Sequence, residues 1–74
     1  MTRNIDSVYK ELGKRIADAR KRSGMSQERL AAESAIDRSH LGFIEQGRRK
    51  PTVATLYKIT KVLGLTLEQM FKGL

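Results

Sequence analysis

Basic side chains are the main groups in this chain that could do chemistry, and that chemistry is the binding of anions. The 74 residues carry 15 Lys and Arg against 8 Asp and Glu, a formal net charge of +7 at pH 7. The cations gather at Lys14–Arg15, Arg20–Arg22 and Arg48–Lys50. Such a surface attracts phosphates, so nucleic acid is the first expected partner and an acidic membrane surface the second. For any one cluster, a solvated surface that aids solubility is the plain alternative.

Residues that catalysis or metal binding would require are scarce. The chain has no cysteine and a single histidine, His40. Catalysis needs two or three reactive groups converging in a pocket, and a metal site needs several ligands. We therefore expect a protein that is not an enzyme and that uses no metal, cofactor or small-molecule ligand. Without cysteines, a signal peptide or a membrane span, it is expected to be cytoplasmic.

Apolar spacing and capping residues predict an all-α fold, a single domain of five short helices. Val8, Leu12 and Ile16 recur at helical spacing, and Asp6 or Ser7 can cap the helix that carries them. This predicts a flexible N-terminal arm at 1–6 and a domain at 7–74. Its helices are expected over about 7–22, 26–33 and 38–46, followed by two more that begin after threonines and carry Leu56, Ile59, Leu63, then Leu67, Met70 and Phe71.

Residues 26–46 have the pattern of a helix-turn-helix unit. Two short helices are joined by about four residues, and the second, at 38–46, opens with polar side chains and leads into a basic loop. The major groove of duplex DNA admits one α-helix, whose N-terminal residues reach the base edges while the preceding helix crosses the backbone. The segment 38–46 is therefore the predicted recognition helix.

The sequence resembles the Cro and phage-repressor type (XRE) family of helix-turn-helix transcriptional regulators, which implies a lambda-repressor-like fold. The resemblance extends from about Leu12 to Phe71. The stretch Asp37–Leu41 also resembles the recognition helix of the controller proteins of restriction-modification systems. The matching motifs are Arg20-x-x-x-Gly24-Met25-Ser26-Gln27-Glu28-x-Leu30-Ala31, Leu41-x-x-Ile44-Glu45-x-Gly47-x-Arg49-x-Pro51-Thr52 and Leu56-x-x-Ile59-x-x-x-Leu63-Gly64.

This resemblance implies roles for individual residues. Arg38 is expected to donate two hydrogen bonds to a guanine, and Phe43 to pack on a thymine methyl or, alternatively, at the edge of the core. Arg20 and Glu45 match a structural ion pair that fixes the recognition helix. Ala35 departs from the family, which usually has glycine in the turn. The expected base contacts are Arg38, Ser39 and Phe43, and the expected DNA backbone contacts are Gln27, His40, Gln46, Arg48, Arg49 and Lys50.

One recognition helix touches only a few base pairs, so we expect a homodimer on an inverted-repeat operator, with half-sites about 34 Å apart. Glu28 and Glu33 are candidates for a contact with RNA polymerase. A protein-interaction module, such as the antitoxin partner of a toxin, is the alternative from another class, and a membrane-surface role is weaker. The expected dimer interface consists of Tyr57, Val62, Leu67, Met70, Phe71 and Leu74.

Overall fold

Five helices make up the computed structural model, which describes residues 4–74. They are α1 (Ile5–Arg22), α2 (Gln27–Glu33), α3 (Arg38–Glu45), α4 (Val53–Leu63) and α5 (Leu67–Phe71). All regular secondary structure within this range is helical, and the expectation of an all-α fold with five helices is confirmed. No helix among residues 4–74 is both long and apolar enough to cross a membrane.

Small polar side chains determine where most of the helices begin. Ser26 Oγ accepts the backbone N–H of Arg29 at 3.1 Å, and Thr52 caps α4 in the same way. Thr66 and Gln69 form a reciprocal capping box at the start of α5. These bonds satisfy backbone donors that the first helical turn leaves without an intrahelical partner.

The expected start of the first helix was wrong. The cap is Asn4, whose Oδ1 accepts the N–H of Ser7 at 3.1 Å, so α1 begins at Ile5 rather than at residue 7. Asp6 lies inside the first turn, where an acidic side chain interacts favourably with the helix dipole. The predicted arm at 1–6 is thus corrected at its C-terminal part, and residues 1–3 lie outside the described residues.

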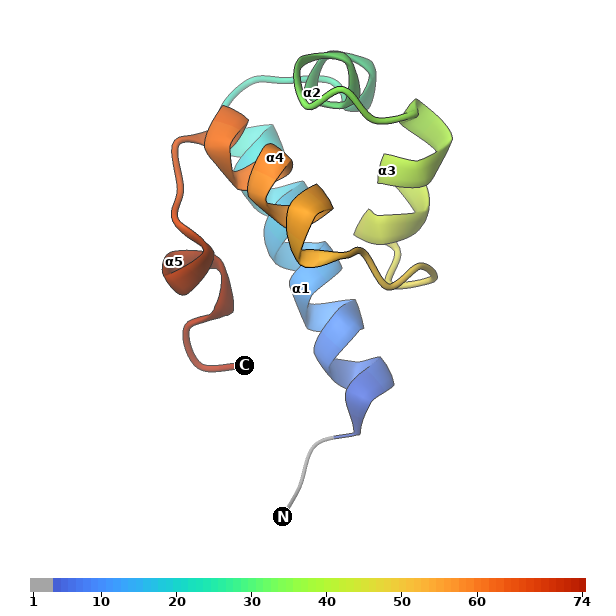
Figure 1. The fold of residues 1–74 in the computed structure, drawn as a ribbon, viewed down its shortest axis with the longest axis vertical. Coiled ribbons are helices and arrows are strands. Elements are labelled where there is room, and N and C mark those ends of the chain that lie inside the picture. The colour runs from blue at the N-terminus through green and yellow to red at the C-terminus, as the bar shows by residue number, and fades with distance from the viewer. Residues whose placement is uncertain (1–3) are drawn as a thin grey trace.

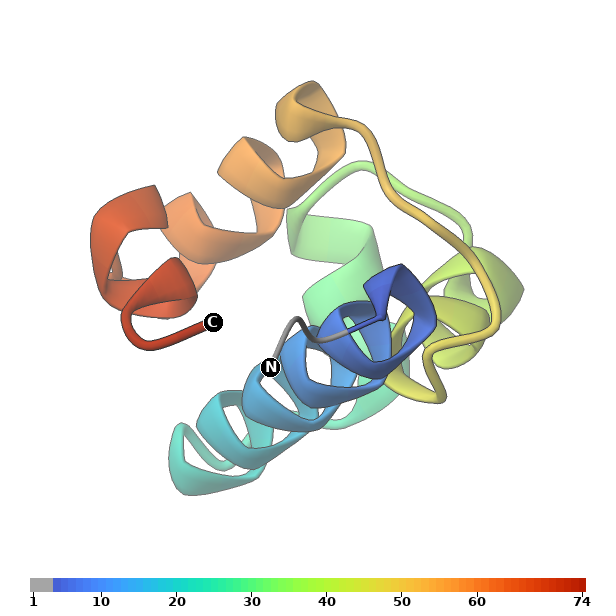
Figure 2. The same ribbon diagram turned by 90° about the horizontal axis from the view of Figure 1, so that it is seen from below.

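The longest helix, α1, packs against both α3 and α5. Figures 1 and 2 show α3 on one side of α1 and α5 on the other, with α2 near the C-terminal end of α1, while α4 packs against α2 and α5. Arg15 of α1 holds the C-terminal segment, because its Nη1 donates to the carbonyl oxygens of Met70, at 3.0 Å, and Lys72.

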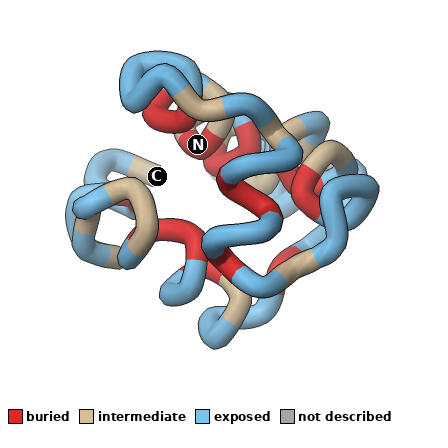
Figure 3. Tube along the Cα trace, turned by 90° about the horizontal axis from the view of Figure 1, so that it is seen from above, coloured by how far each residue is buried: buried red, intermediate tan, exposed pale blue. Residues whose placement is uncertain are grey.

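The core lies where the inner faces of all five helices meet, and the buried stretches in Figure 3 alternate with exposed ones along the tube. This alternation is the packing expected of amphipathic helices. Leu63, which the sequence places with Leu56 and Ile59 on the fourth predicted helix, is only half-buried and packs against the margin of the core. The buried apolar side chains of this core are Leu12, Ile16, Leu30, Ala31, Leu41, Ile44, Leu56, Ile59 and Met70.

Glycine lets α1 approach the end of α3 at backbone distance. A Cβ on Gly13 would lie 2.6 Å from the carbonyl oxygen of Glu45 and closer still to that of Ile44. A Cβ on Gly47 would lie 2.7 Å from Lys10 Cα. Because real Cβ atoms do not come this close to backbone, both glycines are needed for α3 to lie at its observed distance from α1.

One residue in the turn between α2 and α3 has a left-handed backbone conformation. That residue is Ala35, with φ of 56°. A side chain in this region costs of order 1 kcal/mol relative to glycine. Ala35 therefore adopts the left-handed conformation at the cost of a small backbone strain.

Candidate nucleic-acid interface

The first turn of α3 presents its side chains to solvent. Arg38, Ser39 and His40 are exposed, and Phe43, one turn further along, is 36% exposed. A shallow groove between the start of α2 and α3 brings together three side chains expected to face bases and two expected to contact the backbone. Its lining residues are Gln27, Arg38, Ser39, Gly42, Phe43 and Gln46.

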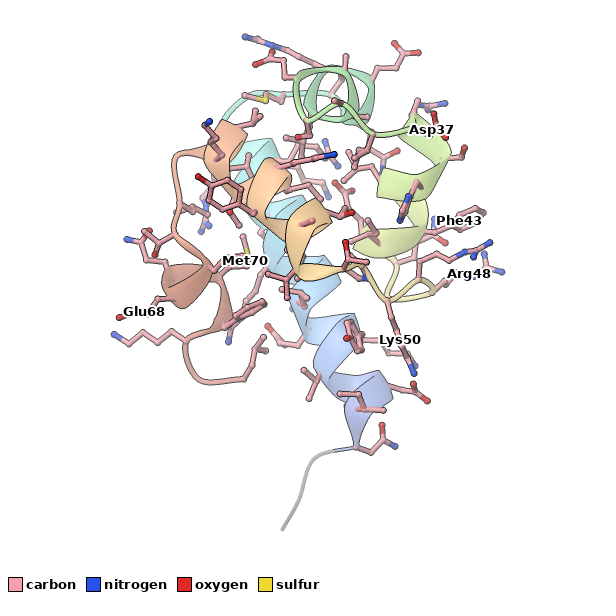
Figure 4. The ribbon with its side chains drawn as sticks, viewed as in Figure 1. Asp37, Phe43, Arg48, Lys50, Glu68 and Met70 are labelled. Atoms are coloured by element: carbon pink, nitrogen blue, oxygen red, sulfur yellow. The ribbon has the colours of Figure 1, made fainter. Side chains whose placement is uncertain are left out.

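The ring of Phe43 lies between the groove and the basic loop that follows α3. The guanidinium carbons of Arg48 and Arg49 lie 5.5 and 5.7 Å from its centroid, within the range of cation–π attraction. Figure 4 shows Phe43 and Arg48 on the outer side of α3. The ring is therefore an exposed part of a cationic surface, and its environment differs from that of the apolar core.

Arg20 and Glu45 form a two-bond ion pair between α1 and α3. Arg20 Nε donates to Glu45 Oε2 at 2.7 Å and Arg20 Nη2 donates to Oε1 at 3.0 Å. Arg20 Nη1 also donates to the carbonyl oxygen of Met25 at 2.9 Å. The hydrogen bond to Glu45 raises the pKa of Arg20; burial works against that rise and the charge of Glu45 adds to it.

Gln27 joins this network from the start of α2. Its Nε2 donates to Glu45 Oε1 at 2.9 Å, so one carboxylate fixes side chains from α1 and α2. Gln27 is the first residue of α2, where backbone N–H groups and the helix dipole favour a phosphate. A bond from Nε2 to Glu45 leaves its second proton for an anion in front of the helix.

Lys50 differs from the two arginines that precede it in the loop. Its Nζ lies 3.5 Å from Asp6 Oδ1 and 5.8 Å from the centroid of the Tyr9 ring. Both Lys50 and Asp6 are mostly exposed, so this ion pair is weak. Among the described residues, Lys50 is the only expected DNA backbone contact whose side chain lies against α1.

The expected dimer residues do not all lie on the surface. Met70 is only 3% exposed and belongs to the core, so its inclusion in the interface was wrong. Tyr57 is 56% and Phe71 37% exposed, whereas Val62, Leu67 and Leu74 are half-buried against the core. The side chain of Met70 points inwards because α5 packs against α1 through it.

Sequence reasoning missed several surface residues. Ile5 and Val53, 57% and 67% exposed, lie beside Phe71 and Leu74 around an apolar cleft of about 250 Å³ between α1, α4 and α5. The helical spacing of Ile5 from Val8 and Leu12 signals its place on that side of α1. The Asp6 contact with Lys50 has no local signal, because the two residues are far apart in the sequence.

The model of the family described as helix-turn-helix matches residues 16–70, most of the chain. The chain belongs to the helix-turn-helix family. The expected resemblance is thereby confirmed, and the matched range contains α2, α3, α4 and the groove beside α3.

Two relatives within the helix-turn-helix family illustrate its range. The HTH-type transcriptional regulator PuuR of Escherichia coli is 41% identical over 59 residues, which are 80% of this chain and 32% of PuuR. The chain thus spans about a third of the length of PuuR. The control protein C.MunI of a Mycoplasma species is 35% identical over 71 residues, 95% of this chain and 96% of C.MunI.

Solved structures of helix-turn-helix proteins are also similar to this chain. The restriction-modification controller protein C.AhdI of Aeromonas hydrophila superposes with a TM-score of 0.83 at 32% identity, covering 85% of this chain and 96% of C.AhdI. The controller protein C.Esp1396I, solved as a tetramer in complex with its natural 35 base-pair operator, has a TM-score of 0.80 at 31% identity. That match covers 88% of this chain and 86% of C.Esp1396I.

Proposed function

We propose that this protein binds a specific duplex DNA site as a homodimer and regulates transcription from it. The groove beside α3 is the observation that carries the proposal, because it gathers side chains of the types that contact bases and phosphates. A helix of eight residues with an exposed first turn fits the major groove, and the start of α2 lies beside it to hold the backbone.

The residues of this surface divide into readers and anchors. Arg38 reads a guanine through its two-donor fork, Ser39 contacts a base or phosphate, and Phe43 packs on a thymine methyl. The anchors are expected to be Gln27, His40, Gln46, Arg48, Arg49 and Lys50, which contact phosphates and carry little sequence information. Arg20 and Glu45 act indirectly, by holding α3 at its angle to α1 and α2.

Dimerisation doubles the number of base pairs read and predicts an inverted repeat. We place the interface on apolar side chains of α4, α5 and the residues that follow α5: Val53, Tyr57 and Phe71, which are exposed, and Leu74, which is half-buried. This set adds Val53 to the expected interface and leaves out Val62, Leu67 and Met70. This surface lies away from α3, so two copies joined there leave both recognition helices free. The oligomeric state of C.Esp1396I in its operator complex supports a role for self-association.

The similarity to C.MunI, C.AhdI and C.Esp1396I supports a controller protein of a restriction-modification system as the specific role. Glu28 and Glu33 on α2 remain candidates for a contact with RNA polymerase, although Glu33 pairs with Arg29 at 2.6 Å. An antitoxin-type module is not favoured, because the named relatives that cover most of the chain are regulators and control proteins.

Selection of bound sequences from a random duplex library at about 150 mM salt tests the proposal. The wild type is expected to enrich an inverted repeat, and Arg38→Ala to lose the preference at one symmetric pair of guanines. Arg29→Ala is the matched control, since it removes an exposed arginine outside the groove. Salt-sensitive binding by the wild type with no enriched motif would contradict a sequence-specific function.

A further inference from the structure

Asp37 is a carboxylate at the edge of a basic surface. It occupies the N-cap position of α3, with φ of −69° and ψ of 142°. Aspartate is a favoured N-cap residue, because its side chain can accept a backbone N–H, but Asp37 makes no such bond. Within residues 4–74, Asp37 also joins no ion pair or side-chain hydrogen bond.

The surroundings of Asp37 are those of the proposed reading surface. It lines a hollow of about 290 Å³ together with Ser39, His40, Phe43 and Arg49, and it directly precedes Arg38. Figure 4 shows Asp37 and Phe43 on the same outer side of α3. Any duplex that meets Arg38 and Phe43 therefore also comes close to this carboxylate.

A carboxylate in that position is unfavourable against DNA unless a base satisfies it. Two like charges about 4 Å apart repel by roughly 1 kcal/mol in water, and an ionised carboxylate brought against phosphates loses hydration as well. The cost is offset if the carboxylate accepts a hydrogen bond from a base edge. Asp37 then weakens binding to most duplexes. It does not weaken binding to duplexes whose base edge offers a hydrogen-bond donor to the carboxylate.

The base that fits is a cytosine. An ionised carboxylate only accepts hydrogen bonds. In the major groove cytosine presents the N4 amino donor, whereas adenine adds an acceptor beside its donor and guanine presents two acceptors. Arg38, which only donates, has the opposite preference and fits guanine.

We propose that Asp37 is a specificity-determining residue, which accepts a hydrogen bond from the N4 amino group of a cytosine within one base step of the guanine read by Arg38. This inference rests on the proposed function and deepens it, because it adds a base to the half-site. It gives complementary tasks to the N-cap residue and the first residue of α3, because Asp37 accepts a hydrogen bond and Arg38 donates.

Two substitutions at Asp37 separate reading from capping. Asparagine caps helices as well as aspartate does, so Asp37→Asn is expected to keep the fold and α3 intact. Its amide has both a donor and an acceptor and fits adenine. Asp37→Ala removes both the cap position's polar group and the acceptor. Asp18→Asn is the control for charge, because Asp18 is exposed on α1 in a hollow beside α5.

The experiment repeats the selection with the four proteins and measures each on the selected site and on a duplex lacking it. Asp37→Ala is expected to lose about tenfold of the cytosine preference and to bind the unrelated duplex up to about fivefold more tightly. Asp37→Asn is expected to move the preference from cytosine to adenine, and Asp18→Asn to leave it unchanged.

Each outcome decides between distinct ideas. If the wild type enriches a motif and both Asp37 variants enrich the same one, the inference about Asp37 is wrong while the proposed function stands. A change of preference that Asp18→Asn produces equally would also overturn the inference, because it would reflect net charge alone. If the wild type enriches no motif, the proposed function itself fails, and the inference fails with it.

Discussion

Arg20 and Glu45 meet through two parallel hydrogen bonds, 2.7 and 3.0 Å long, with side chains only 11% and 5% exposed. The pair connects α1 to the last residue of α3. Two-bond geometry fixes direction as well as distance, so the angle between α1 and α3 depends on this contact.

Arg20→Ala is expected to lower the free energy of unfolding by about 3 kcal/mol, because it leaves the carboxylate of Glu45 buried without its partner. The raised pKa of Arg20 means that this contribution is complete below the ordinary value of arginine and is lost only as pH rises through the raised one. Urea denaturation at neutral pH measures the effect. Arg29→Ala, which breaks an exposed pair with Glu33, is the control and should cost at most about 1 kcal/mol; equal losses would show that the buried pair has no special role.

Alanine is expected to have opposite effects at two helical glycines. Gly13→Ala would place a Cβ 2.6 Å from the carbonyl oxygen of Glu45, so α1 and α3 must separate at a cost of about 1 to 3 kcal/mol. Gly42→Ala meets only Gln27 Oε1, at 3.9 Å, and should stabilise α3 by about 0.5 to 1 kcal/mol. Thermal unfolding compares the two variants, and a stabilised Gly13→Ala would disprove the close packing.

Removing a single methyl group from the operator tests the role of Phe43. Deoxyuridine in place of the contacted thymine should weaken wild-type binding about fourfold per half-site, the value of one buried methyl group. Phe43→Ala should bind both duplexes equally, since it has no ring to cover the methyl group. Titrations with the two synthetic duplexes measure this difference. If the wild type bound both duplexes with equal affinity, Phe43 would instead be a residue that packs against Arg48 and Arg49.

The apolar surface on α4 predicts which substitution separates the dimer. Val53 is 67% exposed and is the first residue of α4, where an acidic side chain interacts favourably with the helix dipole. Val53→Asp is therefore expected to yield a folded monomer, which sedimentation velocity detects. Met70→Ala is the contrasting variant, because the side chain is buried and its loss should cost about 2 to 5 kcal/mol of stability. If the Val53→Asp variant remained fully dimeric, the dimer interface would have to lie elsewhere on the protein.

The sequence alone determined the number and order of the helices. Caps such as Ser26, Thr52 and Thr66 act within one turn, and left-handed glycines such as Gly64 end a helix locally. These signals depend on residues three or four positions apart, so they can be recognised without a fold. The surface position of Arg38 followed as well, because a polar first turn on an otherwise amphipathic helix faces away from the core.

Only the tertiary structure decided where individual side chains go once the helices pack. Met70 is buried because Arg15 holds the C-terminal segment against α1, which periodicity on a five-residue helix does not reveal. Lys50 reaches Asp6, which lies 44 positions earlier in the sequence, because the fold brings the two residues together. Asp37 occupies a cap position without using it, and its local sequence indicates the opposite. Local hydrogen bonding sets the helices, whereas these contacts depend on how the helices are packed against one another.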